Sequence, residues 1–342
     1  MAVTPDMTTS AASDTTSSAT SSAMPVEVLA DRPAVLRLDG PPPADPAAWA
    51  AAHRAPLRAA VAEHGAVLVR GLGLADARTV GRVAQELLDE VMAEREGFAT
   101  RHLRADGVYS SSEWPPDQPM CMHHELSYRR EVPATLLFAC LTPPASGGVT
   151  GVADSQTVLE ALDPALVARF QQVGWRLDRN YTDTVGIGRA ESFGAEDREA
   201  VDAYCRRWGI ETEWRPGGDL RTRQRSAAVL RHPVNGRLGW FNQIAFLNEW
   251  TLDPVIREYL TFEFGPDGLP FNSAYGDGGT IDEATVLAIN AVYEKHTLRE
   301  PWQAGDLMVV DNLRMAHSRE PYEGEREVVV VLGDPVRVPD TA

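Results

Sequence analysis

The sequence lacks any apolar run of about 18 residues, the shortest stretch that indicates a membrane-spanning helix. We therefore expect no helical membrane anchor. Cysteine is also scarce, and its three positions are widely spaced: Cys121, Cys140 and Cys205. An odd, scattered set of cysteines indicates no disulfide framework, so we expect a protein of the reducing cytoplasm.

Positive charge is in short supply as well. The chain has 32 Lys and Arg against 49 Asp and Glu, which gives a net charge of −17 and a pI of about 4.9. Such a chain repels phosphate groups overall, so we expect no nucleic-acid partner. The charge favours solubility and says little about a small substrate.

The first 24 residues contain no basic residue and no apolar stretch, and they are rich in Ser, Thr and Ala. A secretory signal needs both missing features, so none is expected. This composition cannot bury enough apolar surface to become ordered, and we predict a disordered tail over 1–24. No linker divides the remainder, so we expect one domain over 25–342.

The chain has 342 residues and 44% of them are hydrophobic, which is enough for a sizeable core. Helical spacing predicts helices at 46–64 and 74–94, with a strand at 65–71 between them. Beyond residue 100, short apolar runs suggest an antiparallel β sandwich or barrel. These runs are 134–141, 147–155, 226–233, 237–243, 306–312 and 326–333. Helices are expected at about 156–171, 195–207 and 281–296.

The stretch "CMHHELSY" (121–128) contains several residues that can bind metals. If it is extended, side chains alternate between faces, so His123 and Glu125 point the same way and His124 points opposite. Cys121 shares the face of His123, but a thiolate suits zinc or copper better than a mixed nitrogen–oxygen site. On its own, this short pattern is more typical of a polar strand end.

A third ligand is available near the other end, in "GDLMVVDNLRMAHSREPYEGEREVVVVLG" (305–333). We expect a strand, a loop carrying His317, and a second strand from about Arg326. With His123 and Glu125, His317 completes the two-histidine, one-carboxylate set that leaves three metal positions open. The remaining histidines are expected to be hydrogen-bonded or exposed side chains that bind no metal: His53, His64, His102, His232 and His296.

The segment "GDLMVVDNLRMAHSREPYEGER", with "HHELSY" upstream, resembles the taurine-dioxygenase-like (TauD/TfdA) superfamily of iron(II)/2-oxoglutarate oxygenases. The resemblance runs from about 65 to 338. Within the superfamily it is similar to the syringomycin-type and asparagine-type β-hydroxylases, which carry His-x-Glu. It implies an α+β double-stranded β-helix (jelly-roll) with flanking helices and a helical insert at about 156–300. It also implies Fe(II) and O2, with 2-oxoglutarate as co-substrate.

The resemblance also implies roles for residues outside the metal set. Arg326 matches the arginine that grips the remote carboxylate of 2-oxoglutarate, although Glu327 stands where many relatives have a second basic residue. Thr150 matches a threonine that contacts the co-substrate. Alone, each is as typical of a surface arginine or a strand-edge threonine. Three further residues are expected near the substrate: Asn242, Trp240 and His124. "YSSSEW" (109–114) is a weaker match to a substrate loop.

The same resemblance implies the reaction. Halogenating relatives replace the metal-binding carboxylate, so Glu125 favours hydroxylation of an unactivated C–H bond, with desaturation or another oxidation as the alternative. The substrate is expected to be an amino acid, free or tethered to a carrier protein, and a homo-oligomer stays open. Arg129, Arg130 and Arg314 could receive a carboxylate or be solvated charges.

Two other classes compete with the oxygenase interpretation. One is a non-catalytic, cupin-like binding protein with a vestigial site. The second is a zinc hydrolase, because zinc also accepts two histidines and a glutamate. The sequence has no His-Glu-x-x-His helix, and a hydrolase has no evident use for the arginine clamp.

Overall fold

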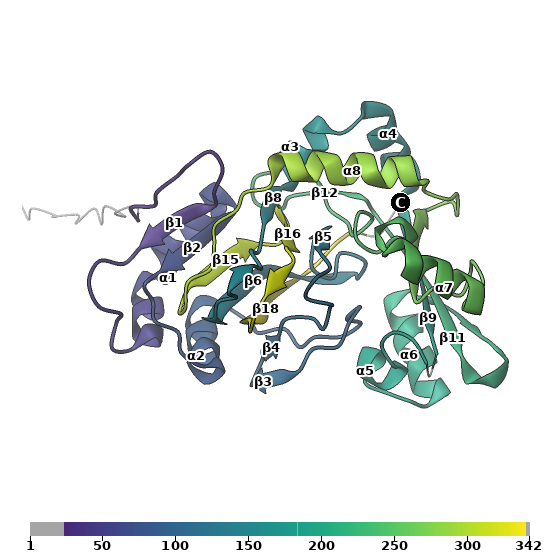
Figure 1. Ribbon diagram of the computed structural model, residues 1–342, viewed down its shortest axis with the longest axis horizontal. Helices are drawn as coiled ribbons and strands as arrows, with labels where there is room; N and C mark the ends of the chain where they lie inside the picture. Colours follow the sequence, from purple (N-terminus) through teal and green to yellow (C-terminus); the bar gives the residue numbers. More distant parts are fainter. Residues whose placement is uncertain (1–23, 183, 340–342) are drawn as a thin grey trace, which may run out of the picture.

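The computed structural model describes residues 24–182 and 184–339 (Figure 1). The tail predicted over 1–24 lies outside these ranges except for Met24, which packs against the core. In the described part of the chain, no helix is long and apolar enough to cross a membrane. Figure 1 shows α1 and α2 at one end of the molecule and the segment carrying α5, α6 and α7 at the other.

A seven-stranded sheet runs through the middle of the fold, in the order β1-β2-β15-β6-β18-β4-β3. Its strands are β1 (Ala34–Arg37), β2 (Ala66–Arg70), β3 (Leu103–Ala105), β4 (Val108–Ser110), β6 (Glu131–Thr142), β15 (Leu307–Asp311) and β18 (Glu327–Arg337). The pair β1 and β2 is parallel, and the other pairings are antiparallel.

Both faces of this sheet are buried, which explains its continuous apolar runs. On β6, Leu137 and Ala139 face one core cluster while Leu136 and Phe138 face another. The first cluster is shared with α1 (Pro46–His64) and α2 (Ala77–Leu87). The second is shared with a three-stranded sheet, β5-β16-β8.

The three-stranded sheet is formed by β5 (Met120–His123), β16 (Met315–Arg319) and β8 (Val152–Asp154). In the register of β16 on β5, His317 stands opposite His123. The two histidines of the candidate metal set, which are far apart in the sequence, are therefore cross-strand neighbours. His317 was expected in a loop, and that expectation is wrong, because β8 and β5 pair with both edges of its strand.

The segment between β8 and β15 is not a purely helical insert, which corrects the expectation for 156–300. It contains a four-stranded antiparallel sheet, β10-β11-β9-β14. Its strands are β9 (Trp175–Tyr181), β10 (Glu211–Trp214), β11 (Leu220–Ser226) and β14 (Phe271–Tyr275). Small pairs are formed by β12 (Val229–Arg231) with β13 (Leu238–Trp240), and by β7 (Ser146–Gly147) with β17 (Tyr322–Glu323).

The helices of this segment are α3 (Ser155–Ala161), α4 (Pro164–Val173), α5 (Arg189–Phe193), α6 (Arg198–Trp208), α7 (Pro254–Phe264) and α8 (Glu283–His296). The single helix expected at 156–171 is two helices, because Pro164 cannot continue α3 and instead occupies the first turn of α4. The Asp163 side chain caps that new start by accepting from two backbone amides.

The predicted helix at 46–64 is confirmed by α1, whereas α2 is shorter than the predicted 74–94. The α2 helix begins after Asp76, whose carboxylate accepts from the Thr79 amide at 2.9 Å. It ends at Leu87 because the following backbone is taken up by β18: the Asp89 amide donates to Asp334, and Val91 bridges to Gly333. Tertiary pairing therefore overrides local helix propensity here.

Candidate active site

Three side chains named from the sequence converge at the end of the β5–β16 pair. His123, Glu125 and His317 are all buried, and each offers a ligand atom within 4.8 Å of the others. The rings of His123 and His317 have centroids 4.2 Å apart, and His317 Nε2 lies 3.7 Å from Glu125 Oε2. His317 is far from His123 and Glu125 in the sequence, and the cross-strand register of β16 on β5 brings it to them.

Glu125 reaches this cluster by a different route from strand alternation. β5 ends at His123, Glu125 lies in the turn that follows, and Leu126 adopts a positive φ of 55°. Asn312 holds the turn in place: its Oδ1 accepts from the Glu125 amide at 2.8 Å, and its Nδ2 donates to the carbonyls of Glu125 and Pro133. The sequence analysis missed Asn312, which follows directly after β15.

The chemistry of this cluster suits a metal ion. His123 Nδ1 donates to the Cys121 carbonyl at 2.8 Å, since a carbonyl only accepts, and this leaves the buried Nε2 without a hydrogen-bond partner. Burial, together with the neighbouring His317, lowers the pKa of His123 to about 3, so the ring is a neutral potential ligand. Two imidazoles and one carboxylate form a donor set that suits non-haem iron(II).

The carboxylate is charged despite its burial. Burial raises the pKa of Glu125, but Arg101 and the two histidines outweigh it and hold the pKa well below its usual range. Arg101 Nη2 donates to Glu125 Oε2 at 3.0 Å, and Arg101 Nη1 lies 3.3 Å from Glu94 Oε1. Sequence reasoning missed Arg101, because nothing around it repeats the spacing of a ligand motif.

A small cavity of about 40 Å³ opens beside the three ligand candidates. It is lined by Arg101, Ser111, Ser112, Met120, His123, Phe138, Thr150, His317, Ser318, Arg319, Arg326, Val328 and Val330. The cavity therefore brings together two histidines of the cluster and the two residues expected to contact 2-oxoglutarate, Arg326 and Thr150.

Arg326 reaches into this cavity with neutral partners only. Its Nε donates to the Gly148 carbonyl at 3.1 Å and its Nη2 to Thr150 Oγ1 at 3.4 Å. Within the described ranges, no carboxylate forms an ion pair with it. Burial and the nearby Arg319 lower the pKa of Arg326 to about 10, so the group is still a cation at neutral pH. It is suited to bind an anion.

Glycine at position 148 makes room for this arginine. Gly148 has a φ of +65°, and a Cβ placed there would lie 3.1 Å from Arg326 Cδ and 2.8 Å from a Pro144 side-chain carbon. A larger residue would be strained and would push on the guanidinium stem. The "GGVT" stretch therefore lets the backbone approach Arg326 and carries Thr150 to it.

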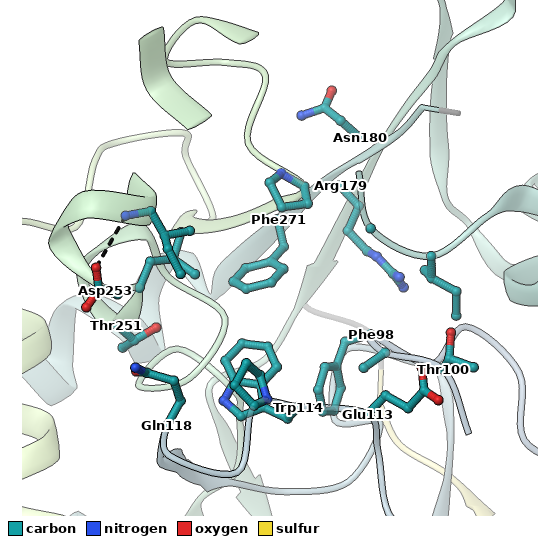
Figure 2. A pocket seen from close by; sticks show the side chains of 17 residues that line it. Phe98, Thr100, Glu113, Trp114, Gln118, Arg179, Asn180, Thr251, Asp253 and Phe271 are labelled. Atoms are coloured by element: carbon teal, nitrogen blue, oxygen red, sulfur yellow. Dashed lines mark hydrogen bonds between the residues drawn. The ribbon is translucent and has the colours of Figure 1, made fainter. Parts of the chain in front are cut away.

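A second, larger cavity of about 360 Å³ has aromatic side chains in its wall (Figure 2). Phe98 and Trp114 line it, and the Phe98 ring also meets the His123 ring edge-on at 6.0 Å. Phe246 stacks on His123 at 4.8 Å and contacts both other aromatics. The Phe98 ring thus belongs both to the wall of this cavity and to the surroundings of the candidate metal ligands.

One cation is buried in the wall of the larger cavity. Arg179, on β9, donates to the carbonyls of Glu96 at 2.8 Å and Gly97 at 2.7 Å. Among the described residues, none of the carboxylates forms an ion pair with it. Figure 2 shows its side chain extending toward the part of the cavity where Phe98 and Thr100 lie, while the Asn180 amide points away.

The three residues expected near the substrate line neither cavity. His124 is buried with its Nδ1 bonded to the Asn312 carbonyl at 2.6 Å, and its ring lies against Phe241. The Asn242 amide donates to the Ala228 carbonyl and accepts from the Ile244 amide, so it shapes its own loop. Trp240 packs edge-on against Phe170 in the core.

Two of the basic residues that could have received a carboxylate have partners inside the protein. Arg129 lies 3.3 Å from Glu96, and Arg314 Nη2 donates to Asp154 at 2.8 Å. These arginines serve the packing of their loops. The larger cavity instead takes its cation from Arg179, which sequence patterns did not single out.

Known proteins are similar to this chain over most of its length. The sequence profile described as "Taurine catabolism dioxygenase TauD, TfdA family" matches residues 33–332. The dapdiamide synthesis protein DdaC of Enterobacter agglomerans is 35% identical over 82% of this chain and 85% of its own. A clavaminate synthase-like protein of Arabidopsis thaliana is 28% identical over 79% of this chain and 82% of its own.

A solved structure is similar in fold. The crystal structure of a taurine dioxygenase from Burkholderia xenovorans superposes with a TM-score of 0.51. It shares 17% sequence identity and covers 92% of each chain. At that identity the likeness concerns the arrangement of helices and sheets alone.

Proposed function

The chain belongs to the TauD, TfdA family of dioxygenases, and from that premise we propose that it hydroxylates an unactivated C–H bond of an amino acid or an amino-acid-derived intermediate. As a member of this family it is an Fe(II)- and 2-oxoglutarate-dependent dioxygenase that uses O2. A protein without catalysis and a zinc hydrolase are both set aside by this membership.

The observation that carries the proposal is the cluster of His123, Glu125 and His317. In our proposal these three residues hold Fe(II), since their ligand atoms lie within 4.8 Å of one another and His123 Nε2 has no other partner. With Fe(II) bound, O2 oxidises 2-oxoglutarate to succinate and carbon dioxide, with one oxygen atom entering succinate and the other delivered to the substrate. The protein's part is to bind and orient the reactants.

Arg326 and Thr150 are proposed to hold the far carboxylate of 2-oxoglutarate. Their support is the small cavity that they share with His123 and His317, and the absence of a carboxylate partner for Arg326 in the described part of the chain. A charged guanidinium beside a hydroxyl gives a carboxylate two donors. The clamp would therefore orient the co-substrate toward the metal.

The larger cavity is proposed to hold the substrate. Its volume of about 360 Å³ falls within the range of small-molecule pockets, and its aromatic wall contacts His123. The buried Arg179 suits the carboxylate of an amino acid. DdaC carries a name that assigns it to dapdiamide synthesis, which supports a natural-product intermediate as the substrate class. A carrier-tethered form belongs to the same proposal.

Glu125 is the reason to propose hydroxylation. A carboxylate at this position occupies the metal face that halogenating relatives leave to chloride. We also propose that the chain belongs to the syringomycin/asparagine β-hydroxylase branch, which its His-x-Glu pattern resembles. A hydroxylated product gains one oxygen atom, whereas a desaturated one loses two hydrogen atoms, so the product mass distinguishes the two outcomes.

We further propose one jelly-roll domain over 25–342, in the cytoplasm. Residues of the segment between β8 and β15 contribute to the same buried cluster as both sheets: Trp175, Leu177, Phe271 and Tyr275. This shared core supports a single unit rather than a separate insert domain. The three cysteines are free thiols, as a reducing compartment favours.

An amino-acid panel tests the function. The Fe(II)-loaded protein is incubated with 2-oxoglutarate and each amino acid, free in one arm and loaded on a carrier protein in the other. Succinate release and product mass are both measured. We expect succinate coupled to the gain of one oxygen atom in one arm. Succinate release that no amino acid in either arm stimulates would contradict the proposed substrate class.

A further inference from the structure

Arg101 lies between two acidic residues beside the candidate metal ligands. Its side chain is only 5% exposed, and it follows the loop that carries Phe98. Nη2 donates to Glu125 Oε2 at 3.0 Å, Nε donates to Ser112 Oγ at 2.9 Å, and Nη1 lies 3.3 Å from Glu94 Oε1. Three contacts on three nitrogens leave the guanidinium little freedom to turn.

The contact with Glu125 uses a carboxylate oxygen that also faces the histidines. Oε2 accepts from Arg101 and lies 3.7 Å from His317 Nε2. Arg101 also lines the small cavity together with His123, His317 and Arg326. The residue thus touches the one acidic ligand candidate at the edge of the space assigned to 2-oxoglutarate.

A carboxylate can bind a metal through one oxygen or through both. The first mode occupies one coordination position of the metal and the second occupies two. A two-histidine, one-carboxylate site functions only if three positions stay open. A charge-assisted hydrogen bond from a fixed guanidinium engages one oxygen and holds the carboxylate plane. Orienting residues of this kind commonly set the geometry of metal ligands.

We propose that Arg101 is a positioning residue that limits Glu125 to one oxygen toward the metal and so keeps a position free for 2-oxoglutarate. This inference rests on the proposed function, in which His123, Glu125 and His317 hold Fe(II). Arg101 carries a positive charge, so it repels a divalent cation. Its presence therefore favours correct geometry at the expense of metal affinity.

Glu94 is the second half of this arrangement. It is the other carboxylate that contacts Arg101, and its side chain is 11% exposed. Without the arginine, two acidic groups would face one another in a buried region, and nothing would hold the Glu125 plane. The ion pair with Glu94 thus anchors Nη1 of Arg101, while Nη2 contacts Glu125.

The test uses Co(II) as a stable substitute for Fe(II), under anaerobic conditions and with the full chain. In Arg101→Met we expect the visible Co(II) spectrum to change before any 2-oxoglutarate is added, since the coordination of Glu125 changes. Co(II) affinity should be unchanged or tighter. The affinity for 2-oxoglutarate should fall about 10-fold, because the lost charge-assisted bond between Arg101 and Glu125 no longer keeps a metal position free. Arg326→Met is the matched control: it should weaken 2-oxoglutarate binding but keep the wild-type Co(II) spectrum.

Arg101→Lys keeps the positive charge and removes the planar guanidinium. It is a second test variant in case the methionine variant does not fold. We expect it to alter the Co(II) spectrum as well, because a lysine ammonium cannot fix the carboxylate plane. A wild-type spectrum with wild-type 2-oxoglutarate affinity in a folded Arg101 variant would overturn the proposal. So would loss of Co(II) binding in that variant, since geometry and affinity would then fall together. Failure of the wild-type protein to bind Co(II) would instead contradict the proposed function.

Discussion

Two arginines at the central sheet, one buried and one half-buried, have opposite surroundings. Arg70, the last residue of β2, bonds to Glu300 at 2.6 Å, to Asp306 at 3.0 Å and to the Pro301 carbonyl at 2.6 Å. Arg326, just before β18, bonds to one carbonyl and one hydroxyl, both neutral. The first charge is fully compensated inside the protein, and the second is not.

The difference shows how to tell a structural polar group from a functional one. A buried charge is costly unless it is paired, so a cation that lies at a cavity without an anionic partner is a candidate to bind an anionic ligand. Histidines repeat the contrast. His232 Nε2 contacts Asp311 at 2.9 Å, while the buried His123 Nε2 has no partner. His123 and Arg326 both line the small cavity.

The largest expected effect separates two adjacent histidines. His123→Ala should reduce bound iron to background and abolish succinate release, because it removes a proposed ligand. His124→Ala should keep its iron but lose about 1–3 kcal/mol of stability, because the buried Asn312 carbonyl loses its donor. Iron content after dialysis and urea unfolding measure the two effects. The reverse pattern would show that the ligand assignment is wrong.

The two arginines should differ next in stability. Arg70→Met leaves the buried Asp306 without its cation and leaves Glu300 with only the more exposed Arg32, so we expect a loss of about 3–5 kcal/mol in the free energy of unfolding. Arg326→Met breaks no ion pair in the described part of the chain, and its loss should stay below about 1 kcal/mol. Urea titration of both variants measures this, and equal losses would break the contrast.

In co-substrate binding the order of the two arginines should reverse. Arg326→Met is expected to raise the KM for 2-oxoglutarate about 10- to 100-fold, the effect of losing a charged hydrogen-bonding group. Arg70→Met, in whatever fraction is folded, should leave that KM unchanged. Steady-state succinate assays over a range of 2-oxoglutarate concentrations give both values. An unchanged KM in Arg326→Met would contradict the clamp.

The smallest effect sharpens the clamp itself. Thr150→Val keeps the shape of the side chain and removes the hydroxyl that lies 3.4 Å from Arg326 Nη2 and accepts from Trp302. We expect the KM for 2-oxoglutarate to rise about 2- to 10-fold, as for one neutral hydrogen bond. A rise as large as that of Arg326→Met would show that Thr150 acts by placing the arginine.

Sequence reasoning reached the candidate ligands but gave the wrong local structure for two of them. Glu125 was predicted on a strand, but that strand ends two residues before it. His317 was predicted in a loop, but it lies within β16. Spacing between histidine and carboxylate is a local pattern, so it is visible in the sequence. The turn that delivers Glu125 depends on Asn312, which is distant in sequence, and so it is not visible.

The strands of the fold also differ in whether the sequence predicts them. Strands with both faces buried, such as β2, β15 and β18, appear as continuous apolar runs and were predicted. The strands β9 and β11 carry many charged residues, and they were missed because their arginines pair across the sheet: Arg221 with Asp178, for example, at 2.8 Å. Arg101 and Arg179 were missed for a similar reason, since only tertiary packing brings them to the cavities.

The central claim is that iron and 2-oxoglutarate share the small cavity between His123, His317 and Arg326. An anaerobic titration of the Fe(II)-loaded protein with 2-oxoglutarate, followed by its visible charge-transfer absorption, tests this most directly. We predict a saturable absorption band in the wild-type protein, a weaker affinity in Arg326→Met and no band in His123→Ala. A wild-type band in His123→Ala, or wild-type affinity in Arg326→Met, would contradict the claim.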